Sequence, residues 1–366
     1  MDDSTNKKTD NSLFDGDRKG GGGVGTEKYT VGSLFAGIGG ICIGFNQAGC
    51  DVKWANEIDK YACYTYRKNS DIIGKNTLIF ECDICDFHPN PCDRIDILTG
   101  GFPCQPYSQA GNKKGLQDSR SLPMFKQMLR IAKECKPRII FMENVSVLKT
   151  IDDGKVFDKL MALLSAAGFK HYPYYILNSK DYSGIAQFRN RIYVVAFKNK
   201  ADYDSFINKI GNGIEKIPIE KNIGTIVDLK KKAEDKYYYS RSDRNKSTSI
   251  RYDEHFEKEV KKKNVIYQYR RTKMRENKND LCPALTASMG LGGHNVPIIR
   301  DKYGIRKLTP SECLQFQGFP EDFKFPDNVC DSQKYKQVGN SVTIPVIYRL
   351  ASIIVESLQD ADQKKE

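Results

Sequence analysis

Residues 29–40 read YTVGSLFAGIGG, an apolar stretch that passes directly into a glycine-rich one. The first seven residues have the length and apolar content of a strand, which ends at a glycine turn. Ile41 and Phe45 follow four residues apart, as on one face of a helix. Gly37 and Gly39 allow a tight turn in which the backbone can approach a ligand. We therefore expect a strand–turn–helix unit that opens an α/β sheet.

The next segments repeat this alternation of strand and helix. VKWANE, IDILTGG, RIIFMEN and RIYVVAF read as strands, and IDILTGG and RIIFMEN are continuous apolar runs, typical of a sheet buried on both faces. Amphipathic helix patterns lie at residues 125–132 and 156–167, and a last one at 346–354 suits a helix that packs back on the sheet. The pattern predicts an α/β fold with a doubly wound, mostly parallel sheet.

This order stops after residue 197, and residues 198–275 show no persistent helical or strand period. We expect a second, smaller, irregular domain there. The predicted organisation is a disordered tail at 1–28, a first domain formed by 29–198 and 334–358, the second domain at 199–333, and a flexible tail at 359–366.

The net charge of +12 is concentrated in one third of the chain. From Lys198 to Arg306 there are 25 Lys and Arg against 15 Asp and Glu. A local excess of this kind suits a polyanion such as nucleic acid, whereas a merely solvated lysine-rich face is the alternative.

Membrane and metal signatures are weak. We find no apolar run of about 18 residues and no apolar segment in the N-terminal region that would serve as a secretory signal, so we expect a cytoplasmic protein without a membrane span. An odd number of cysteines, 11, then indicates reduced thiols. Cys82 and Cys85 form a CxxC, but a structural zinc site needs a second pair, and we expect no metal.

The glycine turn is followed by acids at spacings that suit a nucleotide-type ligand. Glu57 lies 20 residues beyond Gly37, at the end of the second strand, where an acid can bond ribose hydroxyls. Asp83, after the third strand candidate, can receive an adenine amino group. The G-x-G-x-x-G fingerprint is broken at Cys42, and no GxxxxGK[ST] motif is present. A single adenosine-bearing cofactor is favoured, and S-adenosylmethionine fits such a pocket.

A second group of residues suggests covalent chemistry. In GGFPCQPYSQAG, residues 100–111, Pro103 and Pro106 restrict the backbone around Cys104, as a nucleophile that attacks at one angle requires. Glu143 ends the strand FMENV and is expected in the same crevice, where apolar walls would let it donate a proton. The arginines of QFRNRIY, Arg189 and Arg191, can orient a carboxylate, a base carbonyl or phosphates.

Taken together, these motifs resemble the C5-cytosine DNA methyltransferase family, in the family's own order. The matches are FAGIGG, NEIDKYA, CDI, GGFPCQPYSQAG, MENV, QFRNRIY, RKLTPSECLQFQGFP and QVGNSV, over about residues 29–356. The resemblance implies S-adenosylmethionine as cofactor, double-stranded DNA as substrate, and a Rossmann-like catalytic domain beside a target recognition domain at 199–333. A cognate restriction endonuclease and a monomeric state are expected from the bacterial restriction-modification type.

The resemblance also implies roles for single residues. Cys104 would be the nucleophile, Glu143 would contact cytosine N3 and its amino group, and Arg189 and Arg191 would complete the catalytic set. The cofactor would be lined by Phe35, Ala36, Gly37, Gly39, Gly40, Glu57, Ile58, Asp83, Ile84, Pro103, Asn340 and Ser341. Candidate DNA contacts are Gln105, Ser108, Lys113, Lys114, Arg120, Arg270, Arg271, Thr286, Gly292 and Gly293, the last three within CPALTASMGLGGHNVP.

The chemistry follows from the same residues. A thiolate that adds to C6 of cytosine makes C5 nucleophilic, and the target base must first be flipped out of the duplex. Residues 107–122, with Gly111 and Gly115, are expected to form a lid over the DNA.

Three alternatives remain: a tRNA cytosine-5 methyltransferase, a catalytically silent DNA-binding module, and a nicotinamide dehydrogenase. The 100-residue insertion after QFRNR favours DNA over tRNA.

Overall fold

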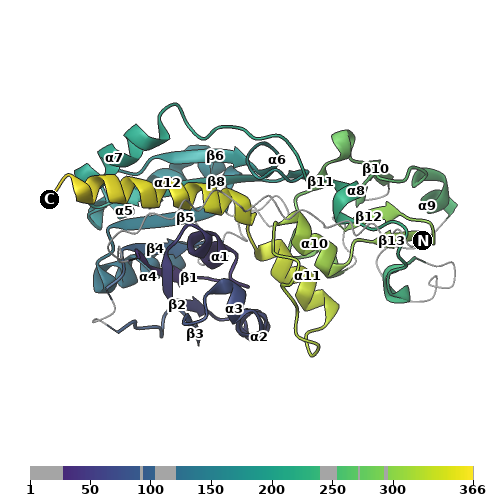
Figure 1. Ribbon diagram of the computed structural model, residues 1–366, viewed down its shortest axis with the longest axis horizontal. Coiled ribbons are helices and arrows are strands. Elements are labelled where there is room, and N and C mark those ends of the chain that lie inside the picture. Colours follow the sequence, from purple (N-terminus) through teal and green to yellow (C-terminus); the bar gives the residue numbers. More distant parts are fainter. Residues whose placement is uncertain are drawn as a thin grey trace, which may run out of the picture.

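The computed structural model describes residues 28–90, 94–103, 121–239, 254–270, 273–291 and 296–365. Figure 1 shows two parts side by side: a large sheet with helices on both faces, and a smaller part that carries its own short strands. The C-terminal helix lies along the large sheet.

The large sheet is mostly parallel and doubly wound, as the sequence predicts. Its strand order is β3-β2-β1-β4-β5-β8-β6. The neighbours from β3 through β5 pair in parallel, whereas β8 is antiparallel to both β5 and β6. The strand order runs outward in one direction from β1 to β3 and in the other from β4 onward. Sheets of this kind bind ligands at the carboxyl ends of the strands beside such a switch point. The strands are β1 Thr30–Leu34, β2 Asp51–Glu57, β3 Leu78–Glu81, β4 Ile97–Gly100, β5 Ile139–Val145, β6 Tyr174–Asn178 and β8 Asn190–Phe197.

Two buried clusters cover the two faces of this sheet. Residues of β5 alternate between them, because successive strand side chains point to opposite faces: Phe141 joins the cluster beneath α1 and α12, and Met142 joins that beneath α4 and α5. The first four residues of β5, Ile139–Met142, are therefore all apolar and buried. The helices of this part are α1 Gly40–Gln47, α2 Lys60–Lys68, α3 Ser70–Ile73, α4 Ser121–Cys135, α5 Lys155–Ala166, α6 Ser179–Tyr182, α7 Lys200–Ile210 and α12 Ile344–Gln363.

The second part is more regular than the sequence suggests. It contains a four-stranded antiparallel sheet of order β10-β9-β12-β13, so the expectation of an irregular domain is wrong on this point. Its strands have only three or four residues, too few to show a period. They are β9 Tyr267–Arg270, β10 Lys273–Glu276, β12 Pro297–Arg300 and β13 Ile305–Lys307, accompanied by α8 Ile223–Ile226, α9 Glu254–Glu259, α10 Pro310–Phe316 and α11 Asp331–Asn340.

The structure differs from the expected segment boundaries at two places. α7 follows residue 199 but packs against α12 of the large part, where Lys209 pairs with Glu356 and Asp360. α12 continues to Gln363 with Ala361 buried, so a flexible tail from residue 359 is wrong. Arg138 and Tyr29 hold the end of α12 in place, because both donate hydrogen bonds to the carboxylate of its Asp362.

One stretch passes a simple test for a membrane span. Residues 331–363, which comprise α11 and α12, reach a mean hydropathy of 1.5 over their most apolar 18 residues. However, 67% of that window is buried inside the protein, and α12 contributes Leu350, Ile354 and Leu358 to the core. The apolar character of this stretch therefore reflects core packing.

Candidate active site

The carboxyl ends of β1 and β2 form the first half of the site, which we call the cofactor edge. The backbone N–H of Gly37 donates to Glu57 Oε2 at 2.8 Å. The other oxygen, Oε1, accepts the N–H groups of Ile58 at 3.0 Å and Asp59 at 2.8 Å. Burial raises the pKa of Glu57, and the N–H donors oppose that rise. The glutamate expected to bind ribose is thus held in place by the glycine turn itself.

The turn between β1 and α1 adopts unusual backbone angles. Phe35 has φ 53°, and Gly37 and Gly39 have φ 57° and 88°. A non-glycine residue with positive φ is strained, and such strain persists mostly at functional sites. A Cβ built on Gly37 would meet no atom within 4 Å, so open space lies over this residue. The backbone there can approach a ligand.

The turn packs directly against the segment that precedes α12. A Cβ on Gly40 would lie 2.8 Å from Ser341 Oγ and 2.9 Å from Val342 Cγ2, so only glycine fits at this contact. Ser341 is buried and Asn340 is exposed. Gly339 and Asn340 are the last residues of α11, and Ser341 is its C-cap. FAGIGG and QVGNSV therefore meet in space, although 300 residues separate them.

Three further expected cofactor residues differ in exposure. Ile58 is 64% exposed, so its apolar side chain is available to contact a ligand. Asp83 is half-buried and accepts the N–H of Cys85 at 2.8 Å, whereas Ile84 is buried in the cluster beneath α4. Open space at Gly37, a fixed carboxylate at Glu57 and an exposed apolar face at Ile58 together fit an adenosine-bearing cofactor. Ile84, which is buried, can contribute to that site only by packing beneath it.

The second half of the site, the substrate edge, lies where β4 and β5 end. Glu143 is 9% exposed, and its Oε1 lies 2.9 Å from Arg191 Nε. This contact is an ion pair without an aligned hydrogen bond, because the same oxygen has no hydrogen-bond partner among the residues that the structure describes. Arg191 lies on β8, opposite Val145 of β5. A carboxylate with an unused, buried oxygen is suited to bind a polar group of a substrate.

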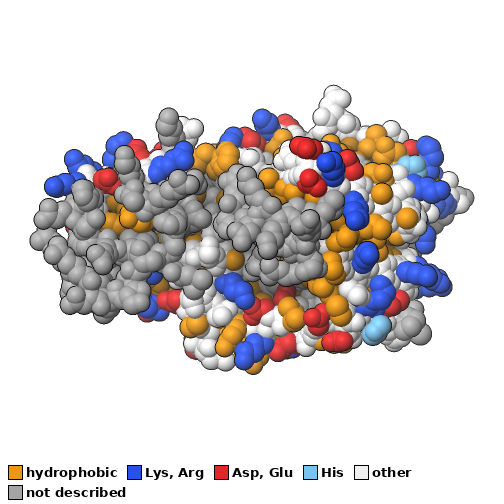
Figure 2. All heavy atoms as spheres, turned by 180° about the vertical axis from the view of Figure 1, so that it is seen from behind, with side chains coloured by type: hydrophobic (Ala, Val, Ile, Leu, Met, Phe, Trp, Pro, Cys, Tyr) orange, Lys and Arg blue, Asp and Glu red, His pale blue; other side chains and the backbone are white. Residues whose placement is uncertain are grey.

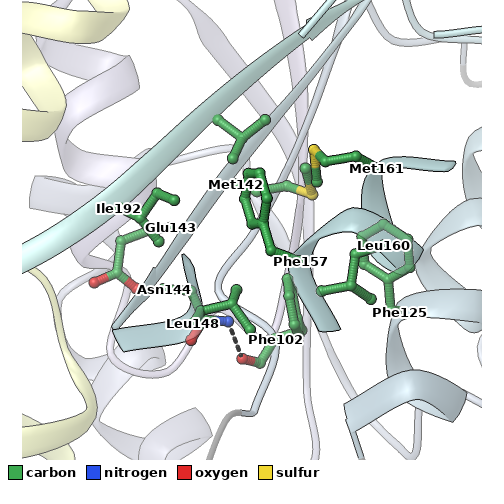
Figure 3. A pocket seen from close by; sticks show the side chains of 11 residues that line it. Phe102, Phe125, Met142, Glu143, Asn144, Leu148, Phe157, Leu160, Met161 and Ile192 are labelled. Atoms are coloured by element: carbon green, nitrogen blue, oxygen red, sulfur yellow. Dashed lines mark hydrogen bonds between the residues drawn. The ribbon is translucent and has the colours of Figure 1, made fainter. Parts of the chain in front are cut away.

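The chain segment that leads to Cys104 passes beside this carboxylate. Asn144 Nδ2 donates to the carbonyl of Phe102 at 3.1 Å, and a Cβ on Gly101 would lie 3.5 Å from Glu143 Oε2. Figure 3 shows this hydrogen bond as a dashed line, with the Glu143 carboxylate directed away from Phe125 and Leu160. Pro103, which follows, is exposed. Cys104 itself lies outside the described residues.

An apolar cavity lies behind the substrate edge. Its volume is about 10 Å³, room for one water molecule at most, and most of its wall comes from side chains of α4, α5 and the sheet. Phe102 and Phe125 pack edge to face across it, with ring centroids 5.4 Å apart. The cavity has few polar atoms and lies beneath the site, so we assign it a packing role.

Arg189 does not share the position of Arg191, contrary to the expectation. It lies between β7, Gln187–Phe188, and β8, and its side chain is buried. It donates to the carbonyls of Leu285, Gly339 and Ser341. Burial and, to a lesser extent, the positive charge of Arg191 lower its pKa to about 9. The structure gives Arg191, and not Arg189, the contact with Glu143.

Most of the residues expected to contact DNA lie outside the described part of the chain. Thr286 lies between β11, Cys282–Pro283, and the 3-10 helix η8, Met289–Leu291, and Arg270 ends β9. Gln105, Ser108, Lys113, Lys114, Arg120, Arg271, Gly292 and Gly293 lie outside the described residues, as does most of the expected lid at 107–122. Figure 2 shows Lys and Arg side chains distributed over the described part of one face, with Asp and Glu among them.

Two contacts of the site were not anticipated from the sequence. The Asn144–Phe102 bond depends on the strand register, which a motif such as MENV does not reveal. Lys336 of α11 pairs with Asp59 at 2.6 Å, a link across 277 positions for which the sequence carries no signal. Among the described residues no group of three or more His, Cys, Asp or Glu side chains could hold a metal ion.

Comparisons with known proteins identify the family of this chain. The family model "C-5 cytosine-specific DNA methylase" matches residues 29–356. The Type II methyltransferase M.Bsp6I of Bacillus sp. (strain RFL6) is 41% identical over 329 residues, which are 90% of this chain and 99% of the relative. Type II methyltransferase M.NlaX of Neisseria lactamica is 35% identical over 349 residues, 92% of this chain and 99% of that protein.

Solved structures show the same fold at low identity. The crystal structure of S. pombe Dnmt2 methyltransferase aligns with a TM-score of 0.63 at 21% identity, covering 90% of this chain and 99% of that one. A putative DNA modification methyltransferase encoded within an E. coli prophage aligns with a TM-score of 0.60 at 21% identity, covering 92% and 100%. With the family match over 29–356, the chain belongs to the C-5 cytosine-specific DNA methylase family and is an S-adenosylmethionine-dependent DNA (cytosine-5-)-methyltransferase.

Proposed function

We propose that the chain methylates cytosine at C5 within one short sequence of double-stranded DNA, through a covalent adduct of Cys104. The observation that carries this proposal is the substrate edge: Glu143, paired with Arg191 at 2.9 Å, stands beside the strand end that leads to Cys104. A buried carboxylate with an unused oxygen suits the N3 and amino edge of a cytosine that has been flipped out of the duplex.

In this reaction the chain's residues hold the base and move protons. The Cys104 thiolate forms a bond to C6 with its own electron pair, while the C5–C6 π pair moves toward C5 and N3. Glu143 donates a proton at N3, which favours the addition. When bound, S-adenosylmethionine supplies the methyl group that C5 takes up. Glu143 takes back the proton from N3 as C5 is methylated, and loss of the C5 proton to a base then returns the electron pair that expels the thiolate and restores the ring.

The cofactor edge is proposed to hold that donor. Glu57 would accept the ribose hydroxyls with lone pairs beyond those used by its three N–H donors, and Ile58 would cover the adenine. Asp83 would take the adenine amino group. Ser341, packed against Gly40, and the neighbouring exposed Asn340 would close the other side.

The biological setting is proposed from the relatives. M.Bsp6I and M.NlaX are named Type II methyltransferases, which suggests that this chain protects DNA from a cognate restriction endonuclease in the cytoplasm, acting as a monomer. A tRNA cytosine-5 methyltransferase is the other candidate. The Dnmt2 likeness, at 21% identity, supports only the shared fold.

Bisulfite sequencing of plasmid DNA from cells that express the chain would test the proposal, with Cys104→Ser as the control. We expect methylcytosine in one short sequence context, and none with the control. Methylation that persists in Cys104→Ser would overturn the nucleophile assignment. Unmodified plasmid DNA together with methylated tRNA would overturn the substrate assignment and establish the second candidate.

A further inference from the structure

Arg189 joins two segments that are far apart in the chain. Its guanidinium donates to Leu285 O at 3.0 Å and Gly339 O at 3.4 Å, and also to Ser341 O. Leu285 belongs to residues 282–291, which run from β11 to η8. We call them the recognition segment because they lie within the expected target recognition domain. Gly339 and Ser341 form the end of α11, beside the proposed cofactor residues. One side chain therefore clamps both segments to the start of β8.

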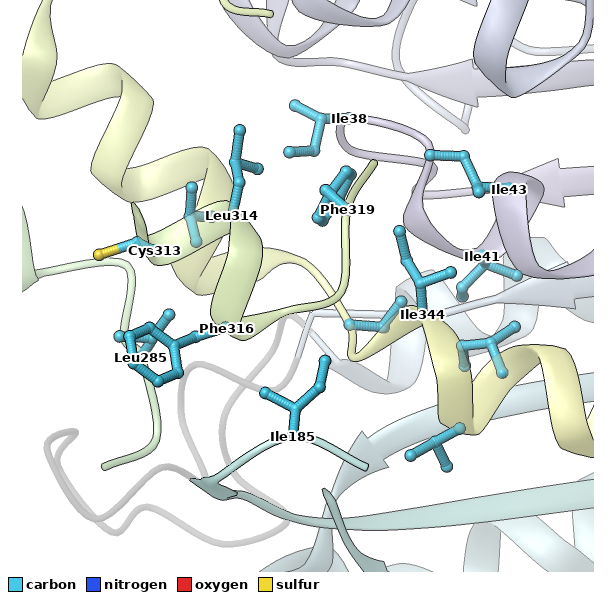
Figure 4. Close-up of a cluster of buried hydrophobic side chains, with 14 of the residues drawn as sticks. Ile38, Ile41, Ile43, Ile185, Leu285, Cys313, Leu314, Phe316, Phe319 and Ile344 are labelled. Carbon is cyan, nitrogen blue, oxygen red and sulfur yellow. The ribbon is translucent and has the colours of Figure 1, made fainter. Parts of the chain in front are cut away.

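The recognition segment and α11 are also in direct backbone contact. A Cβ on Gly339 would overlap the main chain of Thr286 and Ala287, so a glycine is required there. A Cβ on Gly290 would lie 2.7 Å from that of Tyr335 on α11. Leu285 joins Phe316, Leu314 and Ile185 in the buried cluster of Figure 4, which supports the same junction with apolar contacts.

The opposite side of α11 contacts the wall of the cofactor edge. Lys336 pairs with Asp59 at 2.6 Å, and Thr65 Oγ1 donates to Gln337 Oε1 at 2.8 Å. Asp59 follows Glu57 and Ile58 directly and caps α2. A shift of α11 would therefore move the cofactor edge and the recognition segment together.

The chemistry of Arg189 differs from that of the other deeply buried arginine of this region. Arg306 is neutralised by Asp301 and Glu312, which raise its pKa. Arg189 is surrounded by carbonyls, its Nε has no hydrogen-bond partner, and burial lowers its pKa. Burying a charge without a carboxylate partner is costly, so this position is a poor choice for stability alone. The planar fork of five N–H donors suits several carbonyls at fixed angles, which a lysine cannot match.

We propose that Arg189 is a positioning residue that couples cofactor binding to DNA binding, by clamping the recognition segment to the cofactor-binding end of α11. This inference rests on the proposed function. A cofactor that orders Asn340 and Ser341 also fixes the acceptors of Arg189, and thereby the recognition segment. DNA then binds more tightly when the cofactor site is filled, and by reciprocity the cofactor binds more tightly when DNA is present.

The test is the ratio of two dissociation constants for a duplex that carries the methylated site, measured by fluorescence anisotropy without and with S-adenosylhomocysteine. We expect a ratio of about 5 or more for the unaltered chain, as couplings of this kind give. Arg189→Lys should bring the ratio to below about 2, with cofactor affinity in the absence of DNA changed less than about threefold. Arg306→Lys, which alters a buried arginine that does not touch α11, should leave the ratio unchanged.

A second variant covers the case in which Arg189→Lys fails to fold. Lys336→Gln removes the exposed pair with Asp59 and leaves the core intact, so an intermediate ratio is expected. A ratio of 1 for the unaltered chain, or an unchanged ratio in both variants, would overturn the inference. Either result can occur while bisulfite sequencing still shows methylated DNA, so failure of the coupling is distinguishable from failure of the proposed function.

Discussion

The cofactor edge and the substrate edge belong to one sheet but are built in different ways. At the cofactor edge the main chain provides the geometry, with three N–H groups on Glu57 and three positive φ angles in the turn. At the substrate edge side chains provide it, through the Glu143–Arg191 pair and the Asn144–Phe102 bond. Substitutions at the cofactor edge should therefore change cofactor binding, whereas substitutions at the substrate edge should change the rate of methyl transfer.

The largest effect is expected for Glu143→Gln, at the substrate edge. The amide has nearly the same shape but cannot donate a proton as a carboxylic acid does, so methyl transfer in a single turnover should slow by about 10²–10⁴-fold. The KM for S-adenosylmethionine should change by less than about threefold, because Glu143 lies away from the glycine turn. An equal loss of cofactor affinity would show that the two edges are not separate in function.

Arg191→Lys should give a smaller loss at the same edge. It alters the buried ion pair in which Nε lies 2.9 Å from Glu143 Oε1, because lysine keeps the charge but not the planar geometry of the guanidinium. The single-turnover rate should therefore fall about 10–100-fold. In a double variant with Glu143→Gln the losses should be less than additive, since both act on one pair. Arg67→Lys, which alters the exposed pair with Glu81, is the matched control and should retain full activity.

Sequence reasoning was most reliable where a short motif determines local structure. The strand before FAGIGG, the helix after it and the expected position of Glu57 all follow from residues within 30 positions of one another. The Gly37–Glu57 bond, which the spacing did not itself predict, then joins them. The motif QFRNR illustrates the limit, because two arginines two residues apart were expected to share one face.

The structure separates those two arginines because their partners come from elsewhere in the chain. Arg191 lies on β8 and meets Glu143 of β5, whereas Arg189 precedes the strand and meets carbonyls near residues 285 and 339–341. No local pattern encodes these acceptors. The recognition part was underestimated for a related reason: its strands are too short to show a period, and their order depends on long-range pairing such as that of β9 with β12.

Gly37→Ala tests the cofactor edge through the backbone. At φ 57° an added Cβ costs about 1–2 kcal/mol of strain, and it would enter the open space over the turn, so cofactor affinity should fall about tenfold in calorimetry. Gly49→Ala is a matched control, because Gly49 also has a positive φ, 89°, and no atom within 4 Å of its Cβ position. The two variants should lose similar stability, and only Gly37→Ala should lose affinity. A comparable affinity loss in both would indicate a general folding defect.

The smallest expected effect is the pH dependence that Glu57 imposes on cofactor binding. Burial raises its pKa above the ordinary 4.5, so on acidification it takes up a proton earlier than an exposed glutamate. As pH falls through the raised pKa, the carboxylate loses the charge with which it would accept ribose hydroxyls, and cofactor affinity should fall by less than about tenfold per pH unit.

Folding stability should respond in the opposite direction in the same pH window. Between 4.5 and the raised pKa the folded chain binds more protons at Glu57 than the unfolded chain, so this residue's contribution to the free energy of unfolding increases as pH falls. Calorimetric titration with S-adenosylhomocysteine, beside chemical denaturation at each pH, measures both. Glu57→Gln should bind more weakly at neutral pH and lose both dependences; retention of the affinity trend in that variant would place the titrating group outside the cofactor edge.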